Sequence, residues 1–235
     1  MPASDARSSV VEWVQFPAGA YLLEGELVYG SGADGPLGGA VLAGSHPLLG
    51  GNMHNNVVRG LGNGLAERGL ATLRFNYRGI GRSQGPPVDV ARHMAEFWET
   101  SHVAGEMDLW QDVQGAAHFL SPILGSGNPL VLIGYSFGCT LLPSVRLPEP
   151  PAALVLIAPP LSKHDYSEFT TVESPLLVIV SEDDFTSEPQ QLLEWFDRLP
   201  PEKELIQASL DNHFFRGHEP WLVDTVSAFL QEHVV

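Results

Sequence analysis

One stretch limits the fold of this chain more than any other: residues 130–140, which read Leu-Val-Leu-Ile-Gly-Tyr-Ser-Phe-Gly-Cys-Thr. Its first half is a continuous apolar run, the pattern of a strand buried on both faces of a parallel sheet. The run then passes through Gly-x-Ser-x-Gly into residues that can continue as a helix. A sharp strand-to-helix turn holds its serine in a strained backbone conformation, with the hydroxyl exposed. The pattern therefore predicts that Ser136 is a nucleophile.

The glycines at 134 and 138 support this interpretation, because side chains there would collide across so tight a turn. Ser136 would also precede the N-terminus of a helix, where peptide N–H groups point at a developing negative charge. The same five-residue pattern also occurs in ordinary glycine-rich turns, but the strand before it and the helix after it favour the nucleophile. The rest of the chain must then supply a base, an orienting acid and an oxyanion site.

Composition limits the class of protein. The chain has 235 residues, 44% of them hydrophobic, which suits one α/β domain over residues 1–235. Its formal net charge is −16, so its surface would repel phosphate backbones and anionic membranes. The same balance would also arise in a host that uses few lysines. We expect neither nucleic acid nor a membrane as a partner.

Cellular location is predicted from three features of the sequence. The single cysteine, Cys139, cannot form an internal disulfide, so export to an oxidising compartment is not implied. The first nine residues lack the basic-then-apolar order of a signal peptide. No apolar run approaches the roughly 20 residues that span a bilayer. We expect a soluble, cytoplasmic protein, and the oligomeric state stays open.

Hydrophobic patterns predict a regular alternation of elements. Residues 10–16 and 21–29 alternate as paired antiparallel strands. Buried strands are predicted at 39–44, 70–77, 130–135, 153–158, 176–180 and 204–210, and helices at 55–68, 107–120, 188–199 and 219–233. Strands that alternate with helices indicate a mostly parallel central sheet with helices on both faces. The first strands would make the sheet mixed.

Residues 84–105 are too long for an ordinary connection. Loops of this length are usually functional or disordered, and the aromatic content of this one argues against disorder. Phe97 and Trp98 lie within it. We predict a flap over the site, and a helix packed on the flank of the domain is the alternative.

A serine hydroxyl needs a general base, and the base needs an orienting carboxylate. In an open parallel sheet such groups come from loops at the carboxyl ends of strands. Of the nine histidines, His213 stands directly after the last predicted strand, and we assign it as the base. The loop after 176–180 contains Asp183 and Asp184, whose side chains point oppositely on an extended chain. Only one of them is expected to face His213.

The oxyanion site is expected to use two backbone N–H groups. One belongs to Phe137, directly after the serine, and the other to the loop after the 39–44 strand. Pro47 has no N–H, so the second donor is placed at Leu48 or just beyond. His46 would brace this loop. A metal site from His46 and His54 has an i, i+8 spacing that matches no ligand pattern, so no metal is predicted.

Four blocks of the sequence, in order, resemble the α/β-hydrolase superfamily, over nearly the whole chain. They are closest to compact bacterial serine hydrolases with an oxyanion segment of the form His-Pro-x-x-Gly-Gly-x-Met-x-Asn. The blocks are residues 46–55, 72–83, 134–138 and 213–215.

The resemblance implies an α/β-hydrolase fold without a large lid domain, and a catalytic triad of Ser136, Asp184 and His213. It places Asp184 rather than Asp183 at the usual acid position, although Ser181 stands where the family commonly has glycine. It leaves the substrate open, since esterases, thioesterases, peptidases and lyases share this scaffold.

We therefore predict a hydrolase that cleaves carboxylic esters of small acyl groups through an acyl-enzyme on Ser136, without a cofactor. A small-molecule ester is the expected partner. A thioesterase, a peptidase or a non-catalytic binding scaffold of the same fold are the alternatives. Candidates for the substrate pocket are apolar side chains close to the three catalytic positions: Leu49, Trp98, Phe185 and Phe214.

Overall fold

The computed structural model describes residues 9–32, 35–210 and 212–234. Its centre is an eight-stranded sheet with the order β1-β2-β4-β3-β5-β6-β7-β8. The strands are β1 Ser9–Ala18, β2 Tyr21–Gly30, β3 Gly38–Ala43, β4 Leu70–Phe75, β5 Leu130–Tyr135, β6 Ala153–Ile157, β7 Leu176–Ser181 and β8 Lys203–Ala208. β1 and β2 pair antiparallel, as does β2 with β4, and all other pairs are parallel.

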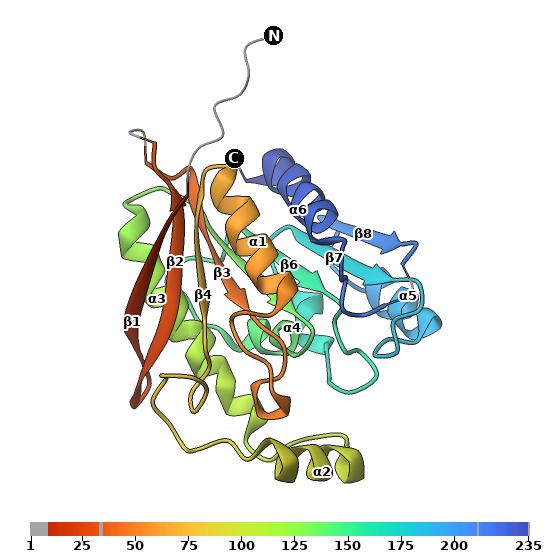
Figure 1. Ribbon diagram of the computed structural model, residues 1–235. Helices are drawn as coiled ribbons and strands as arrows, with labels where there is room; N and C mark the ends of the chain where they lie inside the picture. Colours follow the sequence, from red (N-terminus) through yellow and green to blue (C-terminus); the bar gives the residue numbers. More distant parts are fainter. Residues whose placement is uncertain (1–8, 33–34, 211, 235) are drawn as a thin grey trace.

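Helices cover both faces of this sheet (Figure 1). The longer ones are α1 Asn56–Glu67, α2 Val90–Thr100, α3 Trp110–Leu124, α5 Pro189–Asp197 and α6 Glu219–His233. Short ones are α4 Phe137–Leu141 and the 3₁₀ helices η1 Pro47–Leu49, η2 Glu106–Leu109, η3 Leu142–Ser144 and η4 Ser167–Thr171. α1 and α6 share one apolar core layer, while α3, α4 and α5 share the other. The predicted mixed, mostly parallel sheet is confirmed.

The central strands are buried along their whole length because both faces are covered, and they are mostly apolar, apart from Thr72 and Arg74 in β4 and Ser181 in β7. Every residue of β3, β4 and β7 is buried, which is the pattern expected of parallel strands between two helix layers. The chain from β6 to β7, residues 158–175, contains only η4 as regular structure. This connection is too short for a large lid domain, as the sequence predicts.

One expectation about the helices needs correction. The helix predicted at 107–120 begins at Trp110 and runs to Leu124, with Pro122 inside its last turns. Leu120 and Leu124 are both buried against the sheet, and this packing extends the helix past the proline. The helix after Ser136 has only five residues and gives way to η3 at Leu142.

The long segment at 84–105 folds into α2, which has no buried residue and packs against η1. In Figure 1 it lies below the body of the sheet, away from the helix layers. The segment thus packs on η1, which contains Leu48 and Leu49, and not beside α3 or α6 on a flank of the sheet. Opening and closing of this segment stays a prediction.

No helix in the described ranges combines the length and the hydrophobicity needed to cross a bilayer.

A buried ion pair ties the turn after β4 to α3. The Arg78 guanidinium donates through Nε to Asp112 Oδ1 at 2.8 Å, and the Arg78 backbone N–H donates to Asp112 Oδ2 at 2.7 Å. The Asp112 side chain is fully buried, whereas that of Arg78 is 17% exposed. Because the Asp112 carboxylate is shielded from water, its charge is stabilised by the Arg78 guanidinium instead.

We expect Asp112→Ala to lower the free energy of unfolding by about 3 kcal/mol, because it leaves the guanidinium without its buried partner. The matched control is Asp224→Ala, which removes the partner of Arg68 on the surface, where the aspartate side chain is 69% exposed. That change is expected to cost less than about 1 kcal/mol. Urea denaturation of the three proteins measures both values, and equal losses would contradict the interpretation.

Candidate active site

Ser136 lies at the sharp turn between β5 and α4. Its backbone has φ 53° and ψ −122°, a conformation that residues other than glycine rarely adopt. The Ser136 N–H donates to Ile157 O at 2.8 Å, which fixes the turn against the end of β6. The strained turn predicted from Gly-x-Ser-x-Gly is therefore present.

Close packing explains the two glycines of the turn. A Cβ on Gly138 would lie 2.1 Å from Ala43 O, and one on Gly134 would lie 2.6 Å from the Cys139 backbone. Both distances are far inside van der Waals contact. The turn can form against β3 only because these positions have no side chain.

His213 connects Ser136 to Asp184 through its two ring nitrogens. Nε2 is 3.0 Å from Ser136 Oγ, and Nδ1 is 2.9 and 3.0 Å from the two Asp184 oxygens. An ionised carboxylate only accepts hydrogen bonds, so Nδ1 carries the proton and Nε2 is left to accept from the serine hydroxyl. The structure thus brings together the three residues that the resemblance assigns as a triad.

Asp184 is buried and held from two sides. Its Oδ1 accepts hydrogen bonds from the Thr186 N–H at 2.9 Å and the Thr186 hydroxyl at 2.6 Å, besides the contact with His213. Burial alone would raise the pKa of Asp184, but the hydrogen bonds from His213 and Thr186 outweigh it, so the pKa lies below its ordinary value. Asp183 is exposed. Of the two aspartates, Asp184 is the one that faces His213.

Two segments with free N–H groups lie beside Ser136. Phe137 is the first residue of α4 and Leu48 the second of η1, where a peptide N–H has no acceptor within its own helix. The ring of His46, just before η1, stacks on that of Phe137 with centroids 4.1 Å apart. This contact places the segment after β3 against the start of α4, and the oxyanion role of the two N–H groups stays a prediction.

Aromatic side chains surround the His213 ring. Phe185 is 72% exposed with its ring centroid 4.9 Å from that of His213, and Phe214 is 43% exposed at 5.5 Å. Leu49 is partly buried in η1. Trp98, also predicted to line the pocket, is 79% exposed on α2 and its ring contacts Phe97. The structure brings Phe185 and Phe214 to the site but does not bring Trp98 there.

Sequence analysis missed Glu106, which braces the segment after β3. Glu106 is 3% exposed, and its Oε2 accepts from His46 Nε2 at 2.9 Å and from the Val103 N–H at 2.8 Å. Burial alone would raise the pKa of Glu106, but these hydrogen bonds bring it below its ordinary value. His46 thus braces this segment through a partner 60 residues away in sequence. No local sequence pattern predicts Glu106 as that partner.

A hollow of about 480 Å³ lies elsewhere, lined by residues of β1 and β2 and of the segments that follow η1 and β4. Trp13, Asn52 and Arg82 are among its lining residues, and Ser136 and His213 are not. The site around Ser136 is therefore separate from this hollow.

Comparison with known proteins identifies the family. The sequence profile of Hydrolase_4, described as serine aminopeptidase S33, matches residues 46–172, more than half of the chain. The protein is a member of the Hydrolase_4 family. The match contains the segment after β3, the block after β4 and Ser136, whereas Asp184 and His213 lie beyond it.

Individual relatives resemble this chain over most of its length. An uncharacterised protein of Rickettsia prowazekii is 25% identical over 203 residues, which are 83% of this chain and 78% of that protein. An α/β serine hydrolase homologue from Coxiella burnetii superimposes with a TM-score of 0.75 at 25% identity, over 93% of this chain and 97% of the other.

A solved structure from Xanthomonas campestris shares the fold. It is described as an α/β serine hydrolase without a lid and gives a TM-score of 0.72 at 24% identity, over 96% of this chain and 94% of the other. The α/β-hydrolase fold expected from the sequence is confirmed, including the lack of a large lid.

The low pKa of Asp184 predicts how stability depends on pH. A depressed carboxyl pKa stabilises the folded state above the unfolded value, about 3.9, and this stabilisation is lost as pH falls through the folded pKa. We expect the free energy of unfolding of Asp184→Asn to fall less steeply below about pH 5 than that of the wild type. Denaturant titrations at a series of pH values measure the slopes. Asp183→Asn, at the exposed neighbour, should keep the wild-type slope.

Proposed function

We propose that this Hydrolase_4 member is a serine esterase that cleaves carboxylic esters of small acyl groups with a triad of Ser136, His213 and Asp184. One observation carries the proposal: His213 Nε2 is 3.0 Å from Ser136 Oγ while its Nδ1 is 2.9 Å from Asp184 Oδ1. These distances match what a general base and its orienting acid require.

In the proposed reaction Ser136 Oγ attacks the ester carbonyl carbon as His213 Nε2 accepts the hydroxyl proton. The tetrahedral intermediate collapses, its bond to the leaving oxygen breaks, and His213 returns the proton to the departing alcohol. Water then attacks the acyl-enzyme with the same proton transfers, which releases the acid and restores the Ser136 hydroxyl. Asp184 holds the imidazole in one tautomer and stabilises its cation.

The oxyanion of the intermediate would be held by the N–H groups of Phe137 and Leu48. Both belong to the first turn of short helices that the His46–Phe137 ring contact keeps side by side. One such donor contributes about 3–4 kcal/mol to stabilisation of the transition state. This proposed chemistry needs only groups of the chain itself and water.

The surroundings of His213 favour an uncharged acyl group. The rings in contact with it are those of Tyr135, Phe185 and Phe214. Aromatic side chains supply apolar contact area, and Leu49 on η1 would add to it. We infer an acyl group that rests on Phe185 and Phe214, with the leaving alcohol toward solvent.

The description of the matched family, serine aminopeptidase, favours a peptidase as the second candidate. Thioester hydrolysis would use the same groups, whereas a binding scaffold would use none of them. The relative kcat/KM values for a panel of nitrophenyl esters, acyl thioesters and aminoacyl amides separate the esterase, the thioesterase and the peptidase. Preference for the amides would reject the esterase in favour of the peptidase.

Covalent labelling tests the nucleophile directly. We expect a fluorophosphonate probe to label the wild type and not Ser136→Ala. On the best ester of the panel, Ser136→Ala and His213→Ala should lower kcat by roughly 10⁴-fold or more, and Asp184→Asn by about 10⁴-fold. Intact-mass spectrometry and steady-state kinetics provide the measurements.

The control for the acid is Asp183→Asn, which changes the exposed neighbour of Asp184. It should retain kcat within about threefold, since surface changes away from the site rarely disturb it. A large loss in this variant with little change in Asp184→Asn would reverse the assignment. Folded wild-type protein that resists the probe and hydrolyses no substrate would favour the scaffold.

Truncation of Phe185 tests the acyl site. For esters of longer acyl chains we expect Phe185→Ala to raise KM about three- to tenfold, because each buried methylene contributes about 0.8 kcal/mol. Acetyl esters should change less. Trp98→Ala is the matched control, and since the Trp98 ring contacts Phe97 rather than His213, its KM should stay within about twofold. An equal rise in KM for Phe185→Ala and Trp98→Ala would mean that Trp98 also contacts the acyl group.

A further inference from the structure

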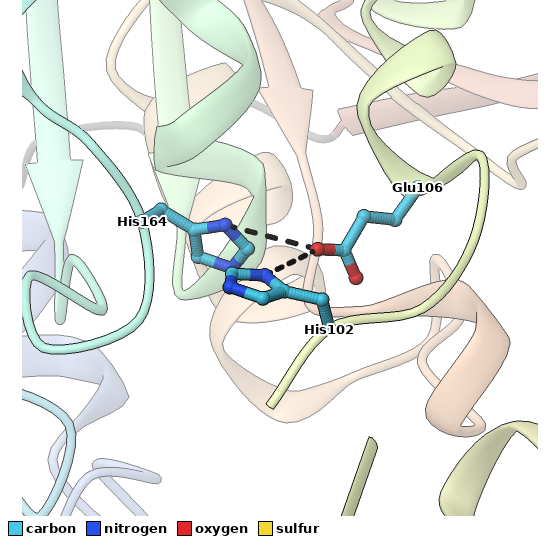
Figure 2. Close-up of side chains that lie close together, drawn as sticks. All are labelled: His102, Glu106 and His164. Atoms are coloured by element: carbon cyan, nitrogen blue, oxygen red, sulfur yellow. Dashed lines mark hydrogen bonds and ion pairs between the residues drawn. The ribbon is translucent and has the colours of Figure 1, made fainter. Parts of the chain in front are cut away.

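Side chains from two segments that are distant in sequence converge next to the candidate active site. His102 lies between α2 and η2, Glu106 begins η2, and His164 lies in the connection after β6 (Figure 2). Their ligand-type atoms, one for each residue, all lie within 4.8 Å of one another. The mechanism proposed above does not use these atoms.

The two oxygens of Glu106 have different surroundings. Oε2 is occupied, because it accepts hydrogen bonds from His46 Nε2 at 2.9 Å and from the Val103 N–H at 2.8 Å. Oε1 faces two imidazole nitrogens instead, His102 Nδ1 at 3.1 Å and His164 Nδ1 at 3.8 Å (Figure 2). Two ring nitrogens therefore face the same carboxylate oxygen.

His164 is the unusual member of this group. Its side chain is 6% exposed, and among the described residues its ring is within ion-pair distance of Glu106 but makes no hydrogen bond. A neutral imidazole nitrogen has a lone pair to offer a metal ion. The ring is thus buried, aimed at a carboxylate oxygen and not yet hydrogen-bonded.

We propose that His102 Nδ1, Glu106 Oε1 and His164 Nδ1 bind a divalent transition metal ion, with Zn²⁺ as the best fit. Zinc bonds of 2.0–2.2 Å in tetrahedral geometry separate neighbouring ligand atoms by about 3.3–3.6 Å. The observed separations of 3.1 and 3.8 Å lie on either side of this value. Two imidazoles with one carboxylate suit zinc, whereas Mg²⁺ and Ca²⁺ prefer oxygen ligands.

The surroundings of Glu106 match those of a metal ligand. Carboxylates that bind metals are usually held by further hydrogen bonds, which orient the free oxygen. His46 and the Val103 N–H do this on Oε2. The His102 side chain is 55% exposed, which opens the site to solvent for entry of the ion and for a water as fourth ligand. A bound ion would replace the proton between His102 and Glu106.

A bound ion would link parts of the chain that are far apart in sequence. His102 follows α2, and His164 follows β6, so the ion would fasten the 84–105 segment to the body of the protein. Glu106 also holds His46, whose ring stacks on Phe137. The site would therefore stiffen the segment that carries the proposed oxyanion donor.

Calorimetric titration of tag-free, EDTA-treated protein with Zn²⁺ tests the site without reference to hydrolysis. We expect one ion bound per chain. Loss of a partner that only orients a ligand lowers metal affinity 10–100-fold, so His102→Ala and His164→Ala should each lower it by at least about 100-fold. With Co²⁺ in place of Zn²⁺, the wild type should give the visible absorption of a tetrahedral ion.

The matched control is His233→Ala. His233 forms a second group with Glu204 and Glu232 that offers the same kinds of ligand atom on the surface. Its loss should leave the affinity within about twofold. Because His102 is half-exposed, its variant is expected to fold and decides the test even if His164→Ala does not.

Three results would overturn the proposal. The first is wild-type protein that binds no Zn²⁺. The second is binding that survives His102→Ala, and the third is binding lost in His233→Ala but kept in His102→Ala.

Discussion

The close packing of β5 and α4 against β3 is the constraint on which the rest of the site depends. Ala43 O approaches so near that a Cβ at Gly138 would lie 2.1 Å away, and a Cβ at Gly134 would lie 2.6 Å from the Cys139 backbone. With glycine at both of these positions, the chain passes from β5 into α4 through a single residue. Ser136 occupies that residue at φ 53°, and its hydroxyl is turned toward His213.

Sheet topology completes the arrangement. In the order β5-β6-β7-β8, the chain leaves the same edge of the sheet at Ser136, then in the loop of Asp184, and finally before His213. β6 lies between the first two and fixes the turn through Ile157 O. Parallel strands place their carboxyl ends on one edge, so residues 77 positions apart in sequence come within hydrogen-bond distance.

Local patterns anticipated much of this protein. Continuous apolar runs located the buried strands, and the position directly after a strand selected His213 as the partner of Ser136. The end of α3 was missed because Pro122 usually ends a helix, and only the burial of Leu124 shows why the helix continues. The surroundings of Trp98 were missed for a similar reason, since which way the α2 segment faces depends on its contact with η1.

The sequence by itself determined the strand-to-helix turn, the alternation of strands and helices, and the order of serine, acid and histidine, because each follows from neighbouring residues. For Asp184 rather than Asp183, local patterns left the choice open and the resemblance favoured Asp184, which the tertiary structure places against His213. Only the tertiary structure decided that Glu106 gathers His46, His102 and His164. These contacts join segments distant in sequence. A side chain's direction there is set by packing and by the hydrogen bonds that burial requires, neither of which leaves a local pattern.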